Sequence, residues 1–156
     1  MDALHAEDRL EVLDREECLA LLAASQVGRL GFVVAEQPRI EPVNYRLVGD
    51  DLVVSSRPGA KLDAALHQQR VALEIDALEE WAQAGWSVLA LGTASVVSDP
   101  AERTALAGGG PHPWAPAPGL MLIRVAVDAL TGRRVRIGPG GVSVVIQDPD
   151  APRPQW

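Results

Sequence analysis

Cysteine is almost absent from this chain of 156 residues, and the histidines are scattered along it. The single cysteine, Cys18, excludes an intramolecular disulfide framework and a cysteine-based metal cluster. Its place on the apolar face of a predicted helix favours a structural thiol over a nucleophile. His5, His67 and His112 lie too far apart for a metal-ligand spacing. We therefore expect no metal site.

Familiar nucleotide-binding and catalytic motifs are also missing. The sequence contains no Gly-x-Gly-x-x-Gly fingerprint, no Gly-x-x-x-x-Gly-Lys-Ser/Thr loop and no Gly-x-Ser-x-Gly elbow. These absences argue against a Rossmann domain, a P-loop enzyme and an α/β-hydrolase. Catalytic residues therefore stay unassigned from the sequence.

Aromatic residues make up only 4% of the chain, and its formal net charge is −7. Nucleic-acid binding, which needs a basic surface, is not expected of such an acidic protein. No apolar run approaches the ~20 residues of a membrane span, and the first residues are too polar for a signal peptide. The sequence predicts a cytoplasmic protein of one domain that does not enter a membrane.

What the chain does contain is a series of short Val-, Leu- and Ile-rich segments separated by turns. Asp14, with Glu17 three residues later, predicts the start of a helix that continues to Ala24. We expect further helices at 61–69 and 100–107, and strands at 27–35, 39–48, 51–56, 70–78, 86–98, 120–127, 133–137 and 142–147. This order predicts a mainly β (α+β) fold, a six- to seven-stranded split β-barrel with short flanking helices.

The same segments suggest domain limits and an oligomeric state. Residues 1–137 would form the barrel domain, with its core at 14–137, and 138–156 a C-terminal strand and proline-rich tail. Residues 30–35 and 87–91 are apolar with little alternation. Because a barrel buries only one face of each strand, the other face needs a cover, and we predict a homodimer.

The strongest positive signal lies at the predicted strand-to-helix junction 55–62. Two hydroxyls, an arginine and the only lysine of the chain surround a glycine-containing turn here: Ser55, Ser56, Arg57 and Lys61. Charge-assisted contacts and the amides of a helix start favour an anion such as a phosphate. The same spacing is equally typical of a polar turn with an N-capping serine.

A second signal lies in the strand before this junction, where polar side chains interrupt apolar sequence. The segment consists of Pro42, Val43, Asn44 and Tyr45. Its amide and phenol could face a polar heterocycle, although a half-exposed edge strand would show the same pattern. Trp86 with Ser87, and Trp114, are candidate walls for a flat aromatic ligand, or simply packing residues.

Taken in order, these pieces resemble the pyridoxamine 5′-phosphate oxidase-like, FMN-binding split-barrel family, near its nitroimidazole-resistance flavoproteins. The resemblance covers roughly 14–137. Its motifs are Glu17-Cys-Leu-Ala-Leu-Leu, Val27-Gly-Arg-Leu-Gly31, Pro42-Val-Asn-Tyr45, Gly59-Ala-Lys61-Leu, Val71-Ala-Leu-Glu-Ile-Asp76, Gly85-Trp-Ser-Val-Leu89, Gly92-Thr-Ala-Ser95, Pro113-Trp-Ala-Pro116 and Thr131-Gly-Arg-Arg134.

The resemblance implies a homodimer with two FMN sites at the subunit interface. The phosphate would be held at the junction, the isoalloxazine ring would lie along residues 42–45, and the partner subunit would contribute its tryptophans. The implied cofactor-binding residues are Pro42, Val43, Asn44, Tyr45, Ser55, Ser56, Arg57, Lys61, Leu62, Trp86, Ser87 and Trp114.

Two departures from the family pattern bear on activity. Residues 138–156 lack the arginine and histidine set that pyridoxamine phosphate oxidases use for their substrate phosphate, so vitamin B6 oxidation is not expected. Asn44 stands where nitroimidazole-resistance proteins usually have histidine. We therefore expect an FMN-dependent oxidoreductase acting on an unidentified small molecule. A deazaflavin-dependent reductase, and a flavin-binding protein without turnover, are the alternatives.

Overall fold

The structure is a computed structural model, and it describes residues 10–109 and 119–136. Trp114 and the expected strand at 142–147 lie outside the described residues. The elements are β1 (Leu10–Leu13), α1 (Arg15–Ala24), β2 (Val27–Val34), β3 (Gln37–Val48), β4 (Asp51–Ser56), α2 (Ala60–Leu66), β5 (Arg70–Glu79), the 3-10 turn η3 (Glu80–Ala82), β6 (Ala84–Val96), α3 (Pro100–Ala107) and β7 (Met121–Val135).

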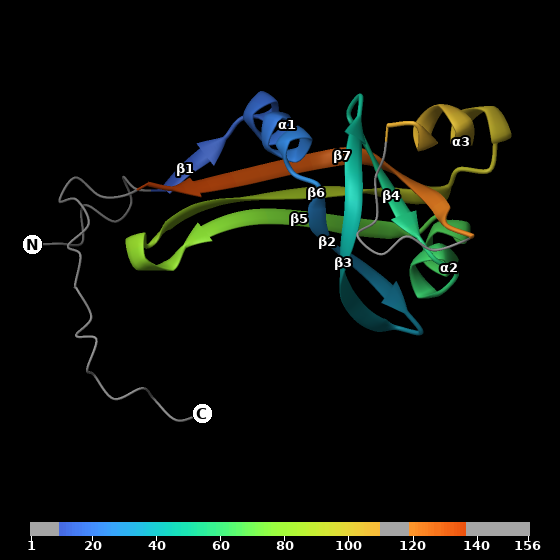
Figure 1. Cartoon of the computed structure of the whole chain (residues 1–156). Helices are drawn as coiled ribbons and strands as arrows, with labels where there is room; N and C mark the ends of the chain where they lie inside the picture. The colour runs from blue at the N-terminus through green and yellow to red at the C-terminus, as the bar shows by residue number, and fades with distance from the viewer. Residues whose placement is uncertain (1–9, 110–118, 137–156) are drawn as a thin grey trace, which may run out of the picture.

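Seven antiparallel strands form one sheet in the order β1-β7-β4-β3-β2-β5-β6. A further pairing joins β6 to β7, so six of the strands close into a ring and β1 lies beside β7 outside it. Figure 1 shows α2 near one end of this barrel and the β5–β6 hairpin at the other. The predicted split β-barrel is therefore confirmed. No helix within the described ranges is long and apolar enough to cross a membrane.

The prediction of two separate strands at 120–127 and 133–137 is wrong, because β7 is one strand of 15 residues. Asp128, Thr131 and Gly132 look like a turn in the sequence, but Thr131 and Gly132 stay paired with β6, and the ladder skips Asp128. A register shift between Leu91 and Gly92 accommodates the irregularity in the ladder. β7 is continuous because it pairs with β6 along its length, and a local sequence pattern does not reveal this pairing.

The four-residue strand β1 was not expected from the sequence. It pairs with the end of β7 from Leu10 opposite Val135 to Leu13 opposite Gly132. Only Leu13 of this strand is buried. A strand so short, with a single core residue, carries too weak an alternation to be found without its partner.

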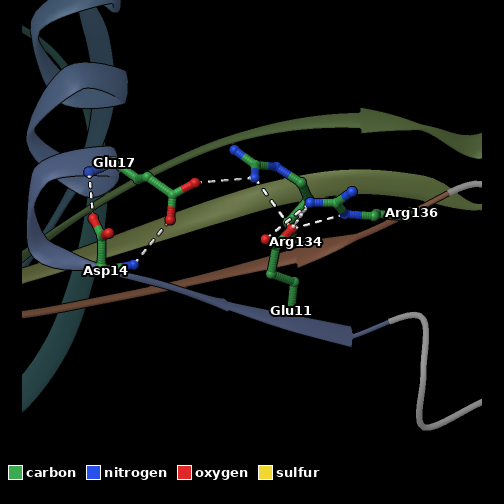
Figure 2. Close-up of polar contacts among 5 residues, drawn as sticks. All are labelled: Glu11, Asp14, Glu17, Arg134 and Arg136. Atoms are coloured by element: carbon green, nitrogen blue, oxygen red, sulfur yellow. Dashed lines mark hydrogen bonds and ion pairs between the residues drawn. The ribbon is translucent and has the colours of Figure 1, made fainter.

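Ion pairs hold β1 and α1 against β7 (Figure 2). The Nε and Nη2 atoms of Arg136 each donate to the Glu11 carboxylate at 2.9 Å, and Arg134 donates to Glu11 at 3.2 Å and to Glu17 at 3.3 Å. The hydrogen bonds from Arg136 are the largest cause that lowers the pKa of Glu11. Glu17 also completes the predicted capping box with Asp14 at the start of α1.

The barrel interior is filled by apolar side chains that alternate along each strand. In β2, for example, Leu30 and Phe32 are buried while Arg29 and Val33 face outwards. Outward-facing residues form a second row across five strands. Each residue of this row is paired with the next one on the neighbouring strand. In the order β3, β2, β5, β6 and β7, they are Ile40, Gly31, Ala72, Leu91 and Ala129.

Candidate functional site

The cavity of most chemical interest lies between β3 and the start of α2, and has a volume of about 560 Å³. We call it the β3–α2 cavity. Its walls come from three places: the middle of β3, the junction between β4 and α2, and the residue before β7. They consist of Glu41, Pro42, Val43, Asn44, Ser55, Ser56, Arg57, Pro58, Gly59, Ala60, Lys61 and Leu120.

The local sequence explains why the chain turns at this point. Pairing of β4 with β7 ends at Ser56, opposite Met121. Gly59 then adopts a φ of +153°, which other residues rarely adopt, and α2 begins at the next residue. No side chain caps the helix, so the N-capping serine of the alternative interpretation is not found. Because α2 has only seven residues, side chains supply most of the positive charge here.

Three charged side chains line the β3–α2 cavity. The Nζ atom of Lys61 lies 2.7 Å from Oε2 of Glu41, and these side chains are 21% and 37% exposed. Arg57 is exposed, and its guanidinium makes no hydrogen bond or ion pair with another described residue. Two positive charges and one negative charge therefore face the same space.

Two serines lie beside these charges at the end of β4. Ser56 is 2% exposed, and its hydroxyl donates to the carbonyl oxygen of Arg57 at 2.8 Å. This hydrogen bond stabilises the turn. Ser55 is half-buried and also lines the cavity. The structure thus brings together four of the residues predicted at the junction, whereas Leu62 packs against the core and does not line the cavity.

The segment 42–45 divides between the cavity and the core. Pro42, Val43 and Asn44 line the cavity, but Tyr45 does not. Its ring is buried, and its hydroxyl donates to the carbonyl oxygen of Leu22 at 2.8 Å. Burial raises the pKa of Tyr45 to about 12. The expectation that its phenol faces a ligand therefore does not fit this structure, in which the side chain is buried in the barrel core.

The predicted residues Trp86 and Ser87 lie in a different cavity. This β5–β6 cavity, of about 420 Å³, is lined by Leu78, Glu79, Glu80, Gln83, Ala84, Gly85, Trp86, Ser87, Arg133 and Val135. The end of the β5–β6 hairpin, which supplies most of these residues, lies at the end of the barrel opposite α2 (Figure 1). One chain therefore does not bring Trp86 to Lys61.

Sequence reasoning missed Glu41 as a residue of the site. Its signal was the single acidic residue of this strand, three positions before Asn44. The partner of this carboxylate, Lys61, is 20 residues away in the chain. Only the packing of α2 beside β3 reveals the pair.

Other residues that could carry chemistry are arranged differently. Within 10–109 and 119–136, no group of three or more His, Cys, Asp and Glu side chains could hold a metal ion. Cys18 is buried, and burial is the main cause that raises the pKa of its thiol. A thiol so placed is a poor nucleophile. The charged and polar side chains of the β3–α2 cavity are therefore the better candidates.

Comparison with known proteins agrees with this geometry. A model of the pyridoxamine 5′-phosphate oxidase family matches residues 14–134, well over half of the chain. The chain belongs to the pyridoxamine 5′-phosphate oxidase family. The resemblance predicted from the ordered motifs is thereby confirmed. The range matched by the family includes all of the β3–α2 cavity and all of the β5–β6 cavity except Val135.

Relatives of this family are similar over most of their length. An uncharacterized protein of Mycobacterium tuberculosis is 34% identical over 128 residues, 79% of this chain and 84% of the relative. A conserved protein of unknown function from Corynebacterium diphtheriae has a TM-score of 0.71 at 27% identity, covering 83% of this chain and 100% of its own. The FAD binding protein from Mycobacterium smegmatis has a TM-score of 0.61 at 27% identity, and the match covers 81% of this chain and 99% of that protein.

Proposed function

We propose that this member of the family binds FMN, with the phosphate of the cofactor in the β3–α2 cavity. The observation that carries the proposal is the position of Arg57 and Lys61 on one wall of that cavity, facing the β3 segment on the other. Guanidinium and ammonium groups are the usual partners of phosphate. The FAD binding protein from Mycobacterium smegmatis, which is similar in sequence and fold, supports a flavin as the class of ligand.

The cavity fits a ligand of this kind in size and in chemistry. Its volume of about 560 Å³ lies within the range of small-molecule sites. Nothing in the described residues comes within 4 Å of the position of a Cβ at Gly59, so a phosphate could approach the backbone there. Among the described residues, the Arg57 guanidinium has no partner that an anion would have to displace.

The proposed activity is that of an oxidoreductase acting on a small molecule. When bound, the flavin supplies hydride transfer, and the protein supplies orientation and a controlled environment. Arg57 and Lys61 would bind the phosphate, with the hydroxyl of Ser55 beside it. Pro42, Val43 and Asn44 would lie along the ring and exclude water from one of its faces.

We further propose that the working unit is a homodimer. Ile40 is 73% exposed and belongs to the outward row that continues through Gly31, Ala72 and Leu91. Large apolar residues at such exposure next to small ones suit a flat contact with a second copy. Ile40 is also the residue before Glu41, so a partner bound to this row would lie next to the β3–α2 cavity.

In such a dimer, the β5–β6 cavity of one subunit would complete the cofactor site of the other. Its apolar walls include Leu78 and the Trp86 ring, which suit a flat aromatic group, and Ser87 adds a hydrogen-bonding group. This arrangement explains why the predicted ring-binding residues fall into two separate cavities of one chain. The site would then be incomplete in a monomer.

Visible absorption of the purified protein tests the proposal directly. The protein is mixed with excess FMN, and in parallel with excess FAD, and then passed over a desalting column. We expect retention of close to one flavin per chain, and an elution volume on size exclusion that corresponds to a dimer. A protein that retains neither flavin at any concentration tested would contradict the proposed function.

A further inference from the structure

The β3–α2 cavity contains a negative charge that an anion site does not need. The Glu41 carboxylate lies 2.7 Å from Nζ of Lys61, and both side chains line the cavity. Glu41 has no other hydrogen bond or ion pair with the described residues. Within the part of the chain that the structure describes, the one charged partner of this carboxylate is therefore a cation of the proposed phosphate site.

We propose that Glu41 is an internal counter-ion. Its carboxylate forms an ion pair with Lys61 until the phosphate of a ligand displaces it. This inference rests on the proposed function. With Arg57 and Lys61 positive and Glu41 negative, the charged residues among the described lining sum to one positive charge. A phosphate at Lys61 must replace the carboxylate and then remain close to it. Glu41 therefore weakens binding in proportion to the charge of the phosphate.

The charge of the ligand then decides how strongly Glu41 opposes it. A phosphate monoester such as that of FMN carries close to two negative charges at about pH 8, since its second pKa is about 6. Each phosphate of the diphosphate linkage in FAD carries one negative charge, and riboflavin carries no phosphate. Glu41 is thus a specificity-determining residue that disfavours a terminal monoester relative to a diphosphate linkage.

Substitution of Glu41 by glutamine removes the charge and keeps the shape of the side chain. Dissociation constants for riboflavin, FMN and FAD are measured by flavin fluorescence, for the full chain and for Glu41→Gln, at low salt. A partly exposed ion pair is worth up to about 1 kcal/mol, so we expect FMN to bind about fivefold more tightly to the variant. The affinity for FAD should increase about twofold, and the affinity for riboflavin should not change.

Glu36→Gln is the matched control, because it removes the same charge from an exposed turn outside the cavity. It should leave all three constants unchanged. Weaker FMN binding by Glu41→Gln would show that Glu41 positions Lys61 for the ligand, and would overturn the inference. The inference would also be overturned if Glu41→Gln changed the dissociation constants of riboflavin and FMN equally, or changed neither. Binding of no flavin by either protein would instead refute the proposed function itself.

Discussion

The hydroxyl of Tyr45 donates a hydrogen bond to the backbone carbonyl oxygen of Leu22 at 2.8 Å, and so joins strand β3 to the end of helix α1. Leu22 lies in the last turn of α1, where carbonyl groups have no partner within the helix. The Tyr45 amide also donates to the carbonyl of Gln26 at 3.0 Å. These two hydrogen bonds therefore anchor β3, which forms one wall of the β3–α2 cavity, to the end of α1 and the residues after it.

Tyr45→Phe should destabilise the fold without affecting the ligand site. The substitution keeps the buried ring but leaves the Leu22 carbonyl without its donor, which costs about 1–3 kcal/mol. Chemical denaturation followed by circular dichroism measures this loss. Flavin affinity should stay within error of the unmodified protein, because the hydroxyl points away from the cavity. A large loss of affinity at unchanged stability would contradict this placement.

Tyr45 is the only tyrosine of the chain, so its titration can be followed by absorbance. We expect a midpoint of about 12 in the folded protein, because burial opposes the phenolate. In the unfolded chain, the pKa of this tyrosine should be about 10. The free energy of unfolding should therefore be insensitive to this group below pH ~10, and should fall as the pH rises towards the folded pKa of about 12. Tyr45→Phe should lack this component, whereas an identical pH profile in both proteins would contradict it.

Gly132→Ala should disturb the contact between β7 and α1. A Cβ atom on Gly132 would lie 2.6 Å from Sγ of the buried Cys18 and 3.0 Å from Cβ of Leu13. Overpacking of this kind costs about 1–3 kcal/mol, measured by thermal and chemical denaturation. Gly108→Ala is the control, because Gly108 has open space around it and a φ of −68°. Equal effects of the two substitutions would show that β7 does not approach α1 so closely.

Local signals in the sequence were enough to predict several elements. The Asp14–Glu17 pair fixes the start of α1, and Gly49 with a positive φ forms the turn between β3 and β4. Apolar segments without long helices between them indicated the barrel. These features depend on neighbours a few residues apart, and the family motifs then placed the segments in order.

Features that depend on distant pairing could not be predicted. The continuity of β7 requires its ladder with β6, and the ion pair between Glu41 and Lys61 requires α2 to lie beside β3. For Tyr45 the sequence indicated only which neighbour shares its face, and the structure was needed to show that this face is buried. Val43 and Tyr45 are two positions apart in a strand, so a buried Val43 places Tyr45 on the same face.

Ile40→Asp should prevent the proposed dimer and leave the subunit folded. The side chain is 73% exposed in the single chain, so its replacement should not affect the barrel core. Desolvating a carboxylate in an apolar contact is unfavourable, and we expect a monomer by light scattering. Ala101→Asp adds the same charge at an exposed position on α3, outside the outward row and both cavities, and should remain dimeric. Full flavin retention by an Ile40→Asp monomer would contradict a site shared between subunits.

Lys61→Ala should weaken FMN binding at least roughly tenfold, since hydrogen bonds to charged groups contribute about 1.5–3 kcal/mol. The substitution also leaves Glu41 without its partner, so the remaining carboxylate repels the phosphate. The double variant Lys61→Ala/Glu41→Gln should therefore bind FMN more tightly than Lys61→Ala alone. Fluorescence titration measures both, with circular dichroism to establish that each variant is folded.

Two further variants separate the charge of Lys61 from a general effect of charge on the protein. Arg103→Ala removes one positive charge from an exposed position on α3, outside the β3–α2 cavity, and should leave FMN affinity unchanged. Riboflavin, which lacks the phosphate, should bind Lys61→Ala as well as it binds the unmodified protein. If Lys61→Ala weakened riboflavin and FMN equally, Lys61 would contact the ring system, and the phosphate would have to lie elsewhere. If Lys61→Ala and Arg103→Ala had the same effect, Lys61 would not contact the phosphate directly, because a direct contact depends on the position of the cation whereas distant charges are largely screened.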